Sequence, residues 1–183
     1  FYDIKNFWFK KKDGSIIKNK MGKLLPKLDD NPEPDRKFMY DADKALRVRG
    51  TKLFMATRGC PYQCTYCFNH AYNALTKGTG EMIRTRSVDS IIQEIKEVQK
   101  NYFMDRVNID DDIFLLKPKG WLEEFAEKYP KEIGLPLYCN IRPELVNEKT
   151  GYLLKKIGCL RAAMGIECGN NEVARKVLKR NTT

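Results

Sequence analysis

From residue 52 onward, segments with the residue patterns of strands alternate with segments that have the patterns of helices, which limits the folds open to this chain. The predicted strands are Lys52–Thr57, Arg106–Asp110, Pro136–Ile141 and Leu160–Ile166. The predicted helices are Ser87–Asn101, Lys119–Tyr129, Glu148–Ile157 and Asn171–Lys179. Four strand–helix units in succession predict an α/β fold with a parallel sheet and right-handed crossovers, flat or curved into part of a barrel. A closed barrel would need more strands.

The first 47 residues predict a different arrangement. Two short strand-like segments, Asn6–Lys11 and Ser15–Lys18, lie on either side of an Asp-Gly dipeptide, which favours the positive-φ turn of a β-hairpin. Residues 23–38 then combine three prolines with several acidic residues. Because proline fixes φ and gives no ladder hydrogen bond, we expect a linker or extended arm here, with the main domain beginning near residue 48.

Three of the six cysteines, Cys60, Cys64 and Cys67, lie within eight residues directly after the first predicted strand. Three thiolates this close together repel one another unless a metal centre takes up their charge, so the pattern favours a shared metal centre over disulfides. Three ligands on a four-iron cluster leave one iron open to an external ligand. His70 could instead complete a four-ligand zinc site. Spacing alone leaves both centres open, although zinc ligands more often come as two separated pairs.

Charge and hydropathy limit the partners of the chain. The formal charge is +10, with 13 Lys and Arg against 8 Asp and Glu in the first 50 residues and 21 against 16 in the rest. This even spread favours a solvated surface over a focused nucleic-acid site. No apolar run approaches the roughly 20 residues that span a bilayer, and no signal peptide is apparent, so a cytoplasmic location is expected. The first residue is Phe rather than Met, which indicates a piece of a longer protein.

The cysteine loop resembles that of the radical S-adenosylmethionine (SAM) superfamily, whose signature is C-x3-C-x-aromatic-C, with Tyr66 at the aromatic position. Four further segments resemble the branch of that superfamily whose members carry an N-terminal cobalamin-binding domain. They are Arg58–Tyr62, Asp110–Phe114, Asn140–Pro143 and Gly165–Asn170. The resemblance implies a partial (βα) barrel of the radical SAM type in residues 48–183, truncated at its C-terminus. It also implies that residues 1–47 are a hairpin and connector at the tail of a cobalamin-binding domain.

The resemblance implies a definite chemistry. Cys60, Cys64 and Cys67 would hold a 4Fe–4S cluster, and the open iron would bind the methionyl group of SAM. An electron from a reductant such as ferredoxin or flavodoxin would then cleave SAM to a 5′-deoxyadenosyl radical. Cobalamin, bound by a domain outside this chain, would take part in methyl transfer or a related radical reaction on a small, natural-product-like substrate.

Four candidate contacts to SAM come from the loop and from the second strand. By resemblance, Tyr66 contacts adenine, and Phe68 belongs to an aromatic wall that excludes water. Asp110, Asp111 and Asp112 end the second strand, and one or two of them, with Asp110 and Asp111 as the named candidates, would contact the methionyl amine. The superfamily's better-known Gly-Gly-Glu motif is absent here, and three adjacent acids are also common in solvated turns, so the partner of the amine stays open.

Two further candidates follow the third and fourth strands. Arg142 would bind the methionyl carboxylate with its guanidinium, although an ordinary surface arginine fits its position equally well. Glu167 would accept hydrogen bonds from the ribose hydroxyls, since side chains at the carboxyl ends of barrel strands usually serve the active site. Cys139 and Cys159 are expected to be small buried hydrophobic residues.

Two other functions compete with a cobalamin-linked radical enzyme. One is a tRNA-modifying radical SAM methylthiotransferase, suggested by the same cysteine loop and the positive charge. The other is a non-enzymatic binding module in which Cys60, Cys64, Cys67 and His70 hold zinc.

Metal analysis of the chain purified without oxygen distinguishes the cluster from zinc. We expect brown protein that contains iron and sulfide, because zinc ligands more often come as two separated pairs than as a single cluster of three cysteines. Colourless protein with one zinc per chain would contradict the prediction of a cluster.

Overall fold

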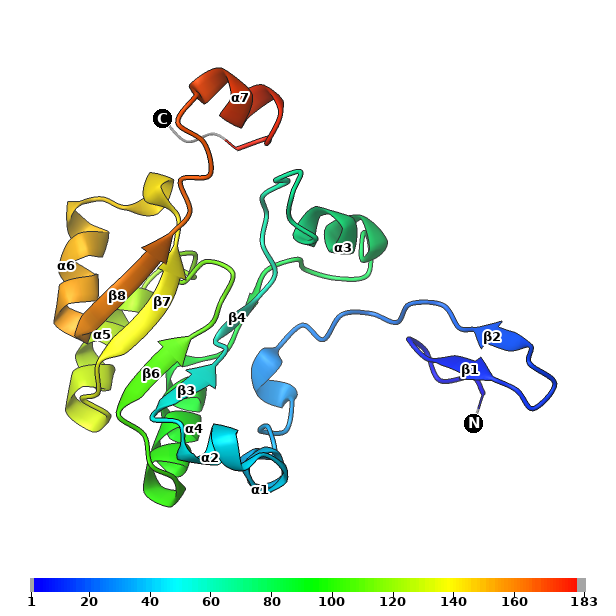
Figure 1. Cartoon of the computed structure of the whole chain (residues 1–183), viewed down its shortest axis with the longest axis horizontal. Coiled ribbons are helices and arrows are strands. Elements are labelled where there is room, and N and C mark those ends of the chain that lie inside the picture. Colours follow the sequence, from blue (N-terminus) through cyan, green and yellow to red (C-terminus); the bar gives the residue numbers. More distant parts are fainter. Residues whose placement is uncertain (1, 181–183) are drawn as a thin grey trace.

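The structure is a computed structural model, and it describes residues 2–180. Its centre is a sheet of four parallel strands in the order β3-β6-β7-β8. These strands are β3 (Thr51–Phe54), β6 (Arg106–Ile109), β7 (Leu137–Ile141) and β8 (Cys159–Met164). The strand order follows the chain order, as in a (βα) barrel, and the sheet is curved and open (Figure 1). The prediction of a partial α/β barrel with parallel strands is therefore confirmed.

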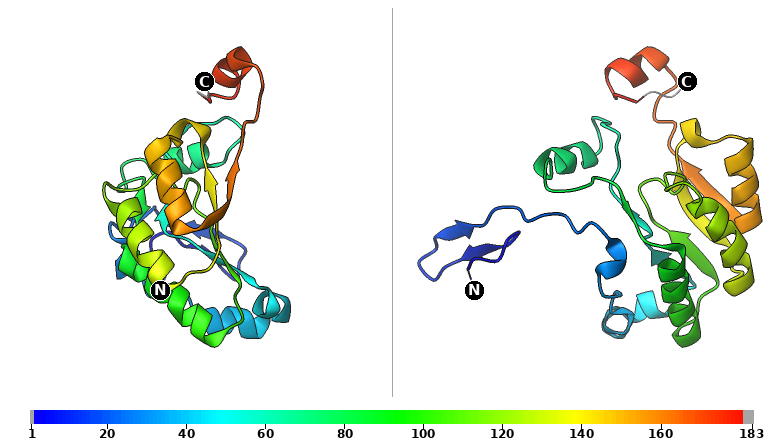
Figure 2. Two further views of the ribbon diagram at one scale, coloured as in Figure 1. Left: turned by 90° about the vertical axis from the view of Figure 1, so that its left-hand side faces the viewer. Right: turned by 180° about the vertical axis from the view of Figure 1, so that it is seen from behind.

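Three long helices cover one face of this sheet (Figures 1 and 2). They are α4 (Val88–Asn101), α5 (Trp121–Glu132) and α6 (Glu148–Ile157). The apolar face that the sequence places on α4 is buried, and the Ser87 side chain caps the helix by accepting the Ser90 N–H. The hydrophobic core lies between these helices and the sheet. Its fully buried members include Ile91, Ile95, Val107, Ile109, Phe125, Tyr129 and Leu137.

The hairpin predicted before the barrel is present. Its strands are β1 (Trp8–Lys10) and β2 (Ile16–Lys18), paired antiparallel, and the turn between them contains Gly14 at φ 85°. Figure 1 shows the hairpin projecting from the barrel on an extended segment. A hairpin followed by a linker is what the sequence predicts for this region.

The connector also contains three short helices that the sequence analysis did not predict. They are η1 (Leu28–Asp30), α1 (Arg36–Ala42) and α2 (Lys44–Val48). Tyr40 of α1 is 4% exposed and packs edge-on against Tyr102, with ring centroids 4.6 Å apart. The proline-rich composition hid these helices, because each is too short to show a periodic apolar face and forms through its contact with the barrel.

The first predicted strand, Lys52–Thr57, is divided in the structure. β3 ends at Phe54, and β4 (Thr57–Arg58) pairs antiparallel with β5 (Arg84–Thr85) instead of continuing in the main sheet. The N–H groups of Ala56 and Thr57 donate to Oδ1 of Asp111, each at 2.8 Å, so a side chain replaces the strand ladder. The strand therefore ends because of a contact between Ala56 and Asp111, which are 55 residues apart in the sequence.

Two helix ends also differ from the prediction. α5 continues to Glu132 although Pro130 was predicted to end it, because a proline in the last turn leaves only one carbonyl without its usual partner. α7 (Asn171–Lys176) ends before the predicted Lys179. The remaining helix, α3 (Asn69–Leu75), follows the cysteine loop. None of the helices within residues 2–180 combines the length and apolar character needed to cross a membrane.

Replacing Phe125 with Ala tests the core between α5 and the sheet. Phe125 is completely buried and stacks between Trp121 and Tyr129, with ring centroids 5.0 and 4.9 Å away. We expect the free energy of unfolding to fall by about 3–5 kcal/mol in denaturant titrations, because the change leaves a cavity. The control is Phe103→Ala, since Phe103 is 66% exposed and should cost far less. Equal losses in both variants would contradict this description of the core.

Candidate functional site

The cysteine loop joins β4 to α3 near the carboxyl ends of the barrel strands (Figure 1). Gly59 starts the loop at φ 97°, and a Cβ there would lie 2.0 Å from the carbonyl oxygen of Met82. Only glycine fits this close approach of two backbone segments. The Asn73 side chain of α3 donates to the Cys60 carbonyl at 2.8 Å and ties the loop to the helix that follows.

A cavity of about 400 Å³ lies against this loop. Its walls come from the loop, from the segment after β6, and from the ends of β7 and β8. The sequence-predicted residues that line it are Cys60, Cys64, Cys67, Tyr66, Arg142 and Glu167. The structure thus brings together all three thiols and three of the six predicted SAM contacts.

The thiols meet in a mostly buried setting. Cys60 is 8% exposed and Cys64 6% exposed, while Cys67 is half-buried. Burial raises the pKa of the Cys60 thiol, and the negative charges of Asp112 and Cys67 act in the same direction. A positively charged group in the cavity would reverse this effect, so the donor set suits a metal centre that stabilises thiolates.

The arrangement of the possible ligands bears on the type of metal centre. Within residues 2–180, no group of three His, Cys, Asp or Glu side chains is arranged to hold one metal ion. In an iron–sulfur cluster each thiolate binds a different iron, so this arrangement still fits a cluster. His70 lies outside the cavity: its Nδ1 contacts the carbonyl oxygen of Cys67, and its ring lines another pocket with Asn73 and Lys77. The structure therefore gives no support to His70 as a fourth zinc ligand.

The three consecutive acids after β6 lie in three different environments. Asp111 is completely buried, forms an ion pair with the equally buried Lys117, and accepts the two N–H groups that end β3. Asp110 accepts a hydrogen bond from Asn140 at 3.2 Å. Asp112 is the acid of this run that lines the cavity, and it accepts a hydrogen bond from Asn69 at 3.0 Å. Asp110 and Asp111 are the acids predicted to contact SAM, and the structure places neither in the cavity wall.

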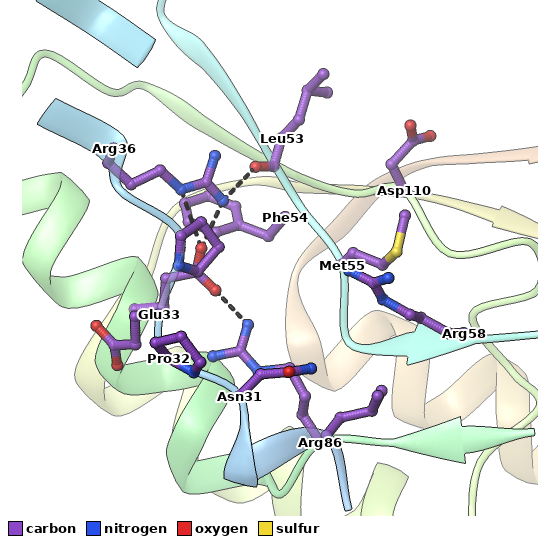
Figure 3. A pocket seen from close by; sticks show the side chains of 13 residues that line it. Asn31, Pro32, Glu33, Arg36, Leu53, Phe54, Met55, Arg58, Arg86 and Asp110 are labelled. Carbon is purple, nitrogen blue, oxygen red and sulfur yellow. Dashed lines mark hydrogen bonds and ion pairs between the residues drawn. The ribbon is translucent and has the colours of Figure 1, made fainter. Parts of the chain in front are cut away.

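Asp110 instead lines a separate pocket of about 250 Å³ between the connector and β3 (Figure 3). Arg36 and Arg86 both pair with Glu94 of α4 in this pocket, and Arg36 also donates to the carbonyl of Leu53 at 3.0 Å. The principal charges here neutralise one another, so the contacts serve to attach the connector to the barrel.

The two aromatic candidates of the loop, Tyr66 and Phe68, lie in different environments. Tyr66 lines the cavity, and its hydroxyl accepts a hydrogen bond from Nη1 of Arg180 at 3.0 Å. Phe68 is 71% exposed and contacts Tyr72, so it is not part of the cavity wall. Arg180 also donates to the carbonyl of Gly165 and is 6% exposed. It was missed in the sequence because nothing distinguishes it there from its basic neighbours.

Thr65 also connects the cysteine loop to the segment after α7. The Thr65 N–H donates to the Leu178 carbonyl at 3.1 Å, and the Thr65 hydroxyl donates to the Val177 carbonyl at 2.9 Å. Residues more than 110 apart in the chain are joined here. The segment after α7 therefore helps to fix the conformation of the cysteine loop.

Arg142 is buried in the cavity wall and contacts three groups. Its Nη2 donates to Glu144 Oε1 at 2.5 Å, its Nη1 donates to the Cys64 sulfur at 3.5 Å, and its guanidinium lies 3.8 Å from the centroid of the Tyr62 ring. Burial raises the pKa of Glu144, but the hydrogen bond and charge of Arg142 outweigh it, so this pKa lies below its usual value. The pair is therefore ionised. Glu144 was not among the residues predicted from the sequence.

Glu167 lies in the cavity wall, in the segment that follows the end of β8 at Met164. Its backbone has φ 65°, a conformation that residues other than glycine seldom adopt. Strain of this kind is commonly found where a side chain is held in a set direction at a functional site.

Comparison with known proteins identifies similar sequences. The family model of the Radical SAM superfamily matches residues 54–183. An uncharacterized methyltransferase of Pyrococcus horikoshii is 24% identical over 89% of this chain and 34% of its own length. The cytidylyl-2-hydroxyethylphosphonate methyltransferase of Streptomyces wedmorensis is 26% identical over 77% of this chain and 25% of its own length.

The bacteriochlorophyllide d C-12(1)-methyltransferase of Chlorobaculum tepidum is 24% identical over 80% of this chain and 31% of its own length. The chain therefore spans about a third or less of the length of these curated relatives, between 25% and 34%.

Replacing Asp111 with Ala tests whether this acid is structural. We expect the free energy of unfolding to fall by about 3–5 kcal/mol, because the change leaves the buried ammonium of Lys117 without its partner. Denaturant titrations of the variant measure the loss. The matched control is Asp110→Ala, which removes an exposed carboxylate next to it and should cost little. An Asp111→Ala variant as stable as the control would contradict the structural role.

Proposed function

The chain belongs to the radical SAM superfamily, and we propose that it is the part of an enzyme that holds a 4Fe–4S cluster and cleaves SAM reductively. The observation that supports this most directly is the cavity in which Cys60, Cys64 and Cys67 meet polar groups from the ends of β7 and β8. When bound, such a cluster supplies a low-potential electron that breaks a carbon–sulfur bond of SAM and gives a 5′-deoxyadenosyl radical.

The side chains of the cavity suit the parts of SAM. We propose that the ring of Tyr66 contacts adenine and that the carboxylate of Glu167 accepts hydrogen bonds from the ribose hydroxyls. We assign the methionyl amine to Asp112, because it is the acid of residues 110–112 that lines the cavity. These assignments use polar groups that already line the cavity.

A carboxylate subsite is proposed between two arginines. The Nε atoms of Arg142 and Arg180 are buried and have no hydrogen-bond partner within the described part of the chain. Both side chains line the cavity. Guanidinium groups bind carboxylates strongly, so we assign the methionyl carboxylate to these two N–H groups.

The relatives support a finer proposal, methyl transfer. All three are named methyltransferases, and two are named for a cytidylyl-linked phosphonate and for bacteriochlorophyllide d. We propose methyl transfer, or a related radical reaction, to a small organic substrate, with cobalamin bound by a domain outside residues 1–183. Residues 1–47 would connect that domain to the radical SAM core in residues 48–183, and a ferredoxin or flavodoxin would supply the electron.

Anaerobic reconstitution with iron and sulfide, followed by incubation with SAM and dithionite, tests the proposed cleavage. We expect 5′-deoxyadenosine to form, and its yield to fall to background in Cys64→Ala because the cluster loses a ligand. The control is Cys168→Ala, which removes a cysteine outside the loop and should retain both iron and product formation. Reconstituted protein that carries iron but leaves SAM intact would refute the proposal.

The role of Tyr66 is tested by the SAM concentration that gives half-maximal cleavage. We expect Tyr66→Ala to raise this concentration about tenfold, because stacking of a base on an aromatic ring is worth roughly 1–3 kcal/mol. Tyr66→Phe keeps the ring and serves as the control, and the two variants should therefore differ. Equal values for both would contradict a contact between Tyr66 and adenine.

A further inference from the structure

The guanidinium of Arg142 connects the sulfur of Cys64, a proposed cluster ligand, to the mostly buried carboxylate of Glu144. Cys64 accepts a hydrogen bond from one N–H group of Arg142, and Glu144 accepts one from another. The ring of Tyr62 covers one face of the guanidinium. The side chains of Arg142 and Glu144 are 6% and 18% exposed. Arg142 thus lies in the cavity wall in direct contact with one thiol, and Glu144 lies against its guanidinium with little water around either group.

From these contacts we propose that Arg142 and Glu144 set the reduction potential of the cluster by adjusting the charge at the Cys64 sulfur. This inference rests on the proposed function, because it requires a cluster on Cys60, Cys64 and Cys67. In this assignment Arg142 and Glu144 act on the cluster through the Cys64 sulfur and do not coordinate iron themselves.

The direction of each effect follows from charge. Reduction adds one negative charge to the cluster, and a positive guanidinium that donates a hydrogen bond to a ligand sulfur stabilises the reduced form. Arg142 therefore makes the potential less negative. The carboxylate of Glu144 lies against the same guanidinium and opposes this effect. Because both groups are mostly buried, solvent screens these interactions weakly.

An arginine suits this position because several contacts must be made at once. The planar guanidinium presents one N–H group to sulfur, another to carboxylate and its face to an aromatic ring. A lysine has one compact ammonium group and could keep the charge without keeping all three contacts. Lysine at position 142 therefore separates the effect of charge from the effect of geometry.

Redox titration of the reconstituted full chain tests the inference. The cluster takes up one electron from dithionite through mediators, and the signal of the reduced cluster in electron paramagnetic resonance reports the midpoint potential. We expect a more negative potential in Arg142→Gln and a more positive one in Glu144→Gln. Arg142→Lys, which retains the charge, should lie between Arg142→Gln and the unchanged protein.

The matched control is Arg161→Gln, which removes the same charge from an exposed residue nearer the amino end of β8. Its potential should equal that of the unchanged protein. A role for Arg142 and Glu144 in folding alone would lower the amount of cluster in both variants without moving the potential in opposite directions.

The possible failures are distinguishable. If the unchanged protein assembles no cluster, the proposed function is wrong and the inference falls with it. If the unchanged protein assembles a cluster but Arg142→Gln and Glu144→Gln leave its potential unshifted, the inference alone is overturned. If Arg142→Gln does not retain a cluster, Glu144→Gln decides: a shift to a more positive potential supports the inference, and no shift overturns it.

Discussion

A buried carboxylate fixes the position at which the cysteine loop leaves the barrel. Asp111 accepts the N–H groups of Ala56 and Thr57 and pairs with Lys117, and both charged side chains are fully buried. Burial lowers the pKa of Lys117, and the charge of Asp111 opposes that effect, so each group depends on the other. This interaction ends β3, directs the chain into β4, and so determines where the loop with the three thiols begins.

The cavity depends on segments that are far apart in the chain. The cysteine loop supplies the thiols, and the segments after β6, β7 and β8 supply Asp112, Arg142 and Glu167. The segment after α7 then returns to the loop through Thr65 and Tyr66. Parallel strands place all of their carboxyl ends at one edge of the sheet, which explains why these residues converge. Hydrogen bonds between the segments give the cavity its particular shape.

Positively charged side chains contact the cysteine loop. Two arginine side chains contact the loop, Arg142 at Cys64 and Arg180 at Tyr66, and both are nearly fully buried. Glu144 partly neutralises the first of them. A site of this kind suits a ligand set that carries negative charge when thiolates bind a metal centre, because the surrounding guanidinium groups compensate that charge without direct coordination.

The sequence by itself determined the parallel α/β class, the hairpin and the three-cysteine loop, since each depends on local periodicity, turn chemistry or spacing. It also placed Tyr66, Arg142 and Glu167 near the carboxyl ends of strands, where the structure brings them together. Only the tertiary structure decided which acid of the run at 110–112 lines the cavity, because neighbouring residues of one loop point in different directions. The break after Phe54 and the contributions of Glu144 and Arg180 likewise depend on side-chain contacts, many of them between distant segments, which leave no pattern in the local sequence.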